Sequence, residues 1–214
     1  MKHEMTASLY EAVNVEIENR EIDRKQCLRV IKGEGKRLRF DENTYARLRG
    51  VTFRNGIIRV QMLSRLLPDA PDFARGFIGI AFRASDNNAE FESFYIRPTN
   101  AMTDDPIRRA HGCQYFSYPG YTFDYFREYG IMGYEAPMEI PLDRWVTLEA
   151  HIDGAKAAFL LNGRETLRVS GLKHGPDASG GVGLFVDIGT EGFFRDLEII
   201  PEDADGPIVS FITP

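Results

Sequence analysis

Cysteine is scarce in this sequence, because only Cys27 and Cys113 occur among its 214 residues. They stand far apart and outside any Cys-x-x-Cys pair, which excludes a disulfide framework, a redox motif and a cysteine metal knuckle. We therefore expect two free, largely buried thiols. The four histidines lack the short spacing of zinc ligands, so no zinc site is predicted either.

Long apolar runs and excess basic charge are also absent. No apolar run reaches membrane-spanning length, and residues 1–10 lack the apolar centre of a secretory signal. The chain is expected to be cytoplasmic as written, or periplasmic or secreted if its native start was removed. With a net charge of −6 and no basic cluster, neither nucleic acid nor a membrane surface is a predicted partner.

What the sequence has is apolar and aromatic content arranged with a period of two. Hydrophobic residues make up 43% and aromatic residues 12%, enough for one sizeable core, so we predict a single domain over 1–214. Apolar and other side chains alternate along short segments that end in turn residues, as in Asn55-Gly56 and Asn162-Gly163. The predicted strands cover 57–65, 75–84, 145–153, 157–161, 182–187 and 193–200, and alternation continues over 91–97.

Regularly spaced strands with glycine turns and almost no helix predict an all-β fold, a two-sheet antiparallel sandwich. The exception is the segment 98–141, which is rich in Gly, Pro and Tyr. It is longer than an ordinary connection, so we predict an irregular loop insertion there, where a functional insertion would sit.

Several segments, taken in order, resemble the successive strands of concanavalin A-like lectin/glucanase domains. They are Gly76-Phe77-Ile78-Gly79-Ile80-Ala81-Phe82-Arg83, Trp145 to Gly154, Phe159 to Gly163 and Gly181-Val182-Gly183-Leu184-Phe185 followed by Phe194 to Leu197. Within that class, the segments are most similar to laminin-G-like and bacterial 3-keto-disaccharide hydrolase-like domains. The resemblance covers most of the chain and implies a jelly roll that handles carbohydrate. The ExDxxE strand of family-16 glucanases is missing, so their retaining mechanism is not carried over.

Three functions stay open at this point. The first is a carbohydrate-binding or carbohydrate-processing domain whose partner is an oligosaccharide or glycoside, and this is our choice. The second is a glycoside hydrolase or lyase acting on a (keto-)disaccharide. The third is a laminin-G-like protein-interaction module with the tyrosine-rich loop as its contact surface.

Candidate ligand-binding residues follow from strand alternation and from the loop. If Ile, Val and Leu face the partner sheet, polar side chains project from the opposite faces and form a polar concave surface next to the loop. Planar polar groups and aromatic rings suit the hydroxyls and apolar faces of sugars. The predicted ligand-binding residues are Arg59, Gln61, Arg83, Tyr95, Arg97, Asn100, Gln114, Tyr115, Arg127, Tyr134, Glu149 and His151.

Catalysis on a glycoside would need two carboxylates, or a base placed beside a carbonyl. Glu128, Glu135 and His111 all lie in the predicted loop insertion at 98–141, so these three are the catalytic candidates. No cofactor is predicted. Calcium is an option that the resemblance leaves open, yet the Asp and Asn clusters at 86–88 and 104–105 lack the spacing of a calcium loop and are predicted to be turns.

Overall fold

The computed structural model describes residues 1–202, so residues 203–214 of the predicted domain lie outside the described residues. Two antiparallel seven-stranded sheets form the two layers of this part of the chain. The β6 sheet has the order β1 (Tyr10–Val13), β4 (Tyr45–Leu48), β13 (Gly181–Val186), β6 (Ile78–Ala84), β7 (Phe91–Ile96), β8 (Cys113–Tyr118) and β9 (Glu135–Ala136). The β5 sheet has the order β12 (Arg164–Val169), β11 (Lys156–Leu161), β10 (Val146–Asp153), β5 (Gly56–Leu66), β14 (Thr190–Pro201), β3 (Lys25–Lys32) and β2 (Val15–Ile22).

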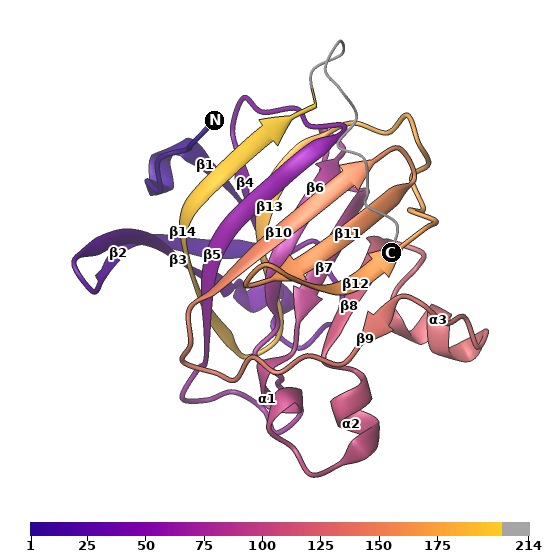
Figure 1. The fold of residues 1–214 in the computed structure, drawn as a ribbon. Coiled ribbons are helices and arrows are strands. Elements are labelled where there is room, and N and C mark those ends of the chain that lie inside the picture. The colour runs from indigo at the N-terminus through magenta and orange to yellow at the C-terminus, as the bar shows by residue number, and fades with distance from the viewer. Residues whose placement is uncertain (203–214) are drawn as a thin grey trace.

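The predicted fold class, an all-β two-sheet antiparallel sandwich, is confirmed (Figure 1). Alternation places Ile58 and Val60 of β5 in the core, together with Ile80 of β6 on the facing sheet. Phe94 of β7 and Phe159 of β11 stack across the interface, with ring centroids 4.3 Å apart. Each fully buried side chain of this size stabilises the fold by about 1.5–3 kcal/mol, so the interface between the sheets is a main source of stability.

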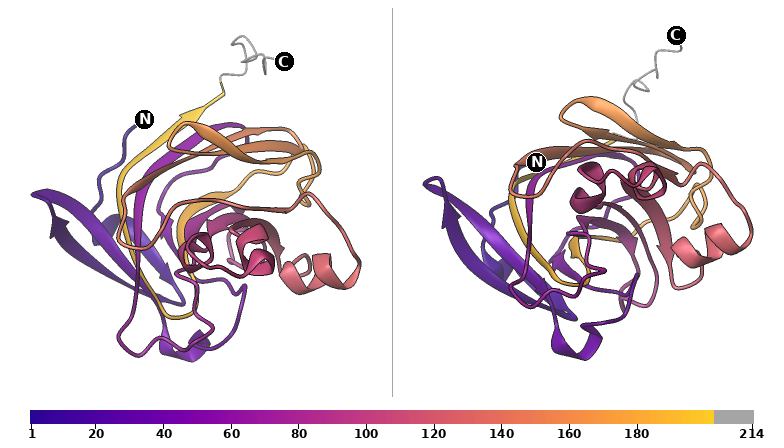
Figure 2. Two further views of the ribbon diagram at one scale, coloured as in Figure 1. Left: turned by 60° about the horizontal axis from the view of Figure 1, so that its bottom comes forward. Right: turned by 90° about the horizontal axis from the view of Figure 1, so that it is seen from below.

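Helices are short and lie outside the two layers. Besides the 3-10 turns η1 (Ala7–Leu9) and η2 (Glu34–Lys36), there are α1 (Pro98–Ala101), α2 (Pro106–Ala110) and α3 (Phe123–Glu128). Figure 1 shows α1 and α2 together below the sheets and α3 beside β9, and Figure 2 shows α1 and α2 facing the viewer at that end. No helix among residues 1–202 is long and apolar enough to cross a membrane.

The segment 98–141 is not one irregular loop, and that prediction is wrong for its middle. Within it β8 pairs along its whole length with β7, from Phe91 opposite Tyr118 to Ile96 opposite Cys113. The two thiols are free and buried, as predicted. The segment therefore contains, in order, α1, α2, the sheet strand β8, α3 and the short edge strand β9.

The outer face of the β6 sheet is aromatic, whereas alternation predicted a polar face. Its side chains form a second buried cluster that includes Phe77, Tyr95, Phe116 and Phe185. The segment 33–44 lies against this face, because Asp41 accepts hydrogen bonds from the Tyr95 hydroxyl and the Phe123 amide. A strand apolar on both faces is what a covered sheet requires.

Candidate functional site

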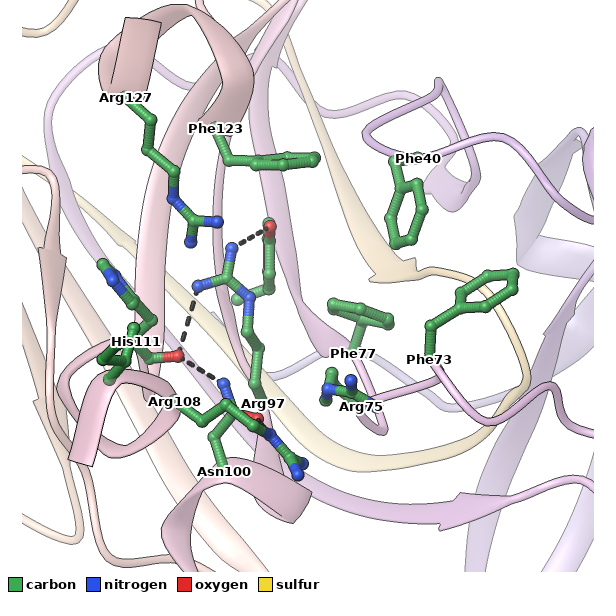
Figure 3. A pocket seen from close by; sticks show the side chains of 12 residues that line it. Phe40, Phe73, Arg75, Phe77, Arg97, Asn100, Arg108, His111, Phe123 and Arg127 are labelled. Carbon is green, nitrogen blue, oxygen red and sulfur yellow. Dashed lines mark hydrogen bonds between the residues drawn. The ribbon is translucent and has the colours of Figure 1, made fainter. Parts of the chain in front are cut away.

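A pocket of about 420 Å³ opens at the outer face of the β6 sheet, beside α2 and α3 (Figure 3). Connecting segments supply most of its walls. It is lined by Phe40, Phe73, Arg75, Phe77, Tyr95, Arg97, Asn100, Ile107, Arg108, His111, Phe123 and Arg127.

The floor of the pocket is made by the sheet itself. Phe77 and Tyr95 belong to the outer aromatic cluster, and their rings meet edge to face with centroids 5.7 Å apart. Both are almost completely buried, at 3% and 1% exposure. A ligand in the pocket would therefore rest on a rigid base, because these rings are held by packing on the sheet.

One side of the pocket is an aromatic wall. The ring of Phe40 lies 5.5 Å from that of Phe73 and 5.7 Å from that of Phe123, measured between centroids. Phe40 and Phe73 remain 40% and 42% exposed. Exposed rings gathered at the mouth of one pocket, unlike single surface rings, provide a flat apolar contact for a ligand.

The opposite side is a basic wall built around Glu135 of β9. Arg97 donates to Oε1 of Glu135 at 2.6 Å, and Arg127 donates to the same oxygen at 2.8 Å. Arg97 also donates to the Tyr95 hydroxyl at 2.9 Å. Arg127 lies over the ring of Phe123, which joins the basic wall to the aromatic one. The two guanidinium groups are thus fixed toward the pocket, as Figure 3 shows for their side chains.

Glu135 is a carboxylate held in its charged form. Burial acts to raise its pKa, but hydrogen bonds and charges from Arg127 and Arg97 outweigh it, and the net pKa is lowered. Nδ1 of His111 lies 2.9 Å from Oε2 of Glu135, without the alignment of a hydrogen bond. The Glu135 carboxylate therefore orients Arg97 and Arg127, and it is poorly suited to release or hold a proton near neutral pH.

Two further arginines of the pocket have only neutral partners. Arg75 donates to the carbonyls of Asp72 and Ala74 at 2.8 and 2.9 Å. Arg108 of α2 donates to Oδ1 of Asn100 at 3.3 Å and to Oγ1 of Thr99 at 3.4 Å. Burial first, and then the positive charges of Arg108 and Arg97, lower the pKa of Arg75. These contacts orient both guanidinium groups and leave donors on each without a partner among residues 1–202.

Several predicted site residues come together here. Tyr95, Arg97, Asn100, His111 and Arg127 line the pocket. Glu135 and Gln114 stand directly behind them, since both accept hydrogen bonds from Arg97. Their roles in binding remain predictions, but their proximity is a property of the fold: Tyr95 and Gln114 are opposite each other on β7 and β8.

Four other predicted residues lie on a different surface, so the expectation of one shared face is wrong. Arg59, Gln61, Glu149 and His151 belong to β5 and β10 and project from the outer side of the β5 sheet. Arg59 pairs there with Glu149 at 3.1 Å and with Glu198 at 2.8 Å. Alternation identified their face correctly, but it could not tell which of the two sheets each strand joins.

Arg83, Tyr115 and Tyr134 also lie away from the pocket. Arg83 is 2% exposed, pairs with Glu92 at 3.3 Å and donates to the Gly154 carbonyl at 2.7 Å. Tyr115 faces the core between the sheets and donates to Glu92 at 2.5 Å. Tyr134 stacks on Phe126. Asp187 and Phe185 are also buried, Phe185 within the outer aromatic cluster of the β6 sheet.

Glu128 ends α3 as an exposed side chain and is not among the residues lining the pocket. A second hollow of about 490 Å³ lies between residues 137–140 and 161–166. It contains Arg164, Glu139 and Glu165 but no aromatic lining. Within residues 1–202 no group of three His, Cys, Asp or Glu side chains could hold a metal ion.

Six residues that line the pocket were not predicted from the sequence as binding residues. They are Phe40, Phe73, Arg75, Phe77, Arg108 and Phe123. They come from segments far apart in the chain, and only the fold brings them together. One local signal was present, the alternation Phe73-Ala74-Arg75-Gly76-Phe77, which sets an arginine between two rings.

No protein-family model matches the sequence, and no curated protein does. Solved structures do match. The carbohydrate-binding module CBM66 from Bacillus subtilis aligns with a TM-score of 0.57 at 12% identity, covering 90% of this chain and 94% of the module. A Bacillus subtilis protein of unknown function with a galectin-like fold aligns with a TM-score of 0.51 at 13% identity, covering 88% and 96%.

A "Putative glycosyl hydrolase" from Parabacteroides distasonis ATCC 8503 aligns with a TM-score of 0.50 at 11% identity, covering 90% of this chain and 99% of that one. The fold is the concanavalin A-like jelly roll. At these identities the likeness concerns the fold alone, so a function has to be argued from the pocket.

Proposed function

We propose that this jelly roll is a carbohydrate-binding domain and that the pocket beside α2 and α3 is its binding site. The observation that carries the proposal is the pocket's two-sided lining: exposed rings of Phe40 and Phe73 stand opposite the fixed guanidinium groups of Arg97 and Arg127. Sugars present apolar ring faces and hydroxyl edges together, and this lining offers a partner for each.

The fold adds support, because a carbohydrate-binding module shares it over nearly the whole chain. Binding fits the pocket better than hydrolysis does. A glycosidase needs a carboxylic acid with a raised pKa, whereas the pKa of Glu135 is lowered by two arginines. Glu128, the other predicted catalytic carboxylate, is exposed on α3.

The test is titration of the ¹⁵N-labelled chain with a panel of oligosaccharides, followed by amide chemical shifts. We expect saturable shifts at Phe40, Phe73 and Arg97. Amides at the second hollow, such as Asn162 and Thr166, serve as the internal control and should not move. A panel that binds nowhere, or only at the second hollow, would contradict the proposal.

A further inference from the structure

The pocket is a strongly basic site on an acidic protein. Four arginines and His111 line it, whereas the chain as a whole carries a net charge of −6. The only carboxylate paired with these arginines in the described part of the chain is Glu135, which is shared by Arg97 and Arg127. The excess positive charge is therefore local to the pocket and does not follow from the protein's overall charge.

The uncompensated charge belongs to Arg75 and Arg108. Both side chains are only partly exposed, and their hydrogen bonds go to carbonyl, amide or hydroxyl oxygens. Asn100 holds Arg108 from one side and donates from its other end to the His111 carbonyl at 2.9 Å. These arginines are thus oriented at some entropic cost, yet no carboxylate within residues 1–202 neutralises them.

Placing positive charges close together in a partly desolvated site is unfavourable unless an anion joins them. Burial is the main cause of the lowered pKa of Arg75, and the positive charges of Arg108 and Arg97 lower it further. Guanidinium groups bind carboxylate and sulfate oxygens through paired hydrogen bonds. Since aromatic rings and these arginines line the same pocket, with Arg75 beside Phe73 and Phe77, a ligand that fills it combines an anionic group with an apolar face (Figure 3).

We infer that the pocket takes an acidic saccharide, a sugar chain with a carboxylate or sulfate group, and that Arg75 and Arg108 bind this anionic group. The inference rests on the proposed carbohydrate-binding function. In this arrangement the sugar ring packs on Phe40 and Phe73, and Arg97 and Arg127, held by Glu135, contact hydroxyl groups. Selectivity for acidic over neutral sugars then comes from the two arginines without a carboxylate partner.

The experiment is isothermal titration calorimetry on the full chain with three ligands of equal length: oligogalacturonates, sulfated galactan oligosaccharides and neutral galacto-oligosaccharides. We expect at least one acidic series to bind about tenfold or more tightly than the neutral series, with affinity that falls as salt rises. The two acidic series distinguish carboxylate from sulfate as the bound group.

Arg75→Gln and Arg108→Gln should each weaken acidic-ligand binding by about tenfold, and this loss should exceed any loss of affinity for the neutral series. Arg75→Lys and Arg108→Lys keep the positive charge but lose the planar guanidinium group that makes paired hydrogen bonds. Their affinity for the acidic ligand should therefore lie between that of wild type and that of the Gln variants. Arg164→Gln, at the exposed arginine of the second hollow, is the matched control and should bind like wild type. Circular dichroism checks that each variant is folded.

Three results separate the inference from the proposed function. Equal affinity for neutral and acidic series would overturn the inference while the carbohydrate-binding function stands. Acidic binding that survives both Gln substitutions would overturn the assignment of Arg75 and Arg108. Absence of binding to all three series by the folded wild-type chain would count against the proposed function itself, and the inference would fall with it.

Discussion

The hydroxyl of Tyr95 lies 3.1 Å from Oδ1 of Asp41, a buried carboxyl that connects the pocket floor to the segment covering it. Oδ2 of Asp41 accepts a hydrogen bond from the Phe123 amide at the start of α3. Asp187 lies next to it and pairs with Lys32. One carboxyl thus joins three elements that form the pocket, so its protonation affects how firmly they are held together.

The first prediction concerns the pH dependence of stability at Asp41. Burial first, and then the charge of Asp187, raise the pKa of Asp41 from 3.8 to about 7. Between these values the folded chain binds more protons than the unfolded chain, so this group's contribution to the free energy of unfolding falls as pH rises from about 4 to 7. Below that window the contribution is fully present.

Asp41→Asn removes the titration and keeps an acceptor for the Phe123 amide. Relative to this variant, wild type should lose up to about 1.4 kcal/mol of stability per pH unit within the window. Urea denaturation of both proteins at pH 5, 6 and 7 measures the difference. Parallel stability profiles for the two proteins would show that Asp41 does not titrate there.

The second prediction separates Glu135 from Glu128, the two predicted catalytic carboxylates. Glu135→Gln weakens the ion pairs that hold Arg97, which is itself almost fully buried, so we expect a loss of about 3 kcal/mol at pH 7. Glu128→Gln, at the exposed end of α3, should change stability by less than about 0.5 kcal/mol. Urea denaturation measures both. Equal, small effects would mean that Glu135 does not organise the basic wall.

The core between the sheets could be predicted from the sequence, because alternation such as Ile58, Val60 and Met62 is dictated by a strand with one covered face. The strands between residues 10 and 48 were not identified, although β2 and β3 form a regular hairpin. Charged residues are frequent in β2, as in Glu16 and Glu18, because it is an edge strand with a largely exposed face.

The pocket could be predicted only in part. Arg97 and His111 were identified because polar residues accumulate where β7 ends and a long connection begins. Phe40, Phe73 and Arg108 could not be placed beside them, since proximity between connecting segments is set by tertiary packing and not by local periodicity. The aromatic outer face of the β6 sheet was missed for a related reason: alternation does not reveal that segment 33–44 covers it.

The third prediction tests Arg83 as a structural residue. It pairs with Glu92 where both side chains are fully buried, and it donates to the Arg54 and Gly154 carbonyls. Arg83→Met should cost about 3–5 kcal/mol, because it leaves the Glu92 charge buried without its partner. The double variant Arg83→Met with Glu92→Gln should be more stable than Arg83→Met alone, since the unpaired charge is gone.

Urea denaturation of the two single variants and the double variant gives the coupling energy. Additive losses would show that the pair does not interact in the way its geometry indicates. Oligosaccharide binding by the folded fraction of each variant should match wild type, because Arg83 does not line the pocket.

The last prediction concerns the aromatic wall. Phe40 and Phe73 are 40% and 42% exposed, so truncating them to alanine should leave the free energy of unfolding within about 1 kcal/mol of wild type. Each truncation removes ring surface that a sugar would cover, and we expect about tenfold weaker binding of the best oligosaccharide in calorimetry. Leu38→Ala is the matched control: Leu38 is 63% exposed on the same segment as Phe40 but does not line the pocket. If all three variants bound alike, the rings of Phe40 and Phe73 would have no part in recognition, and the ligand would have to rest on the basic wall alone.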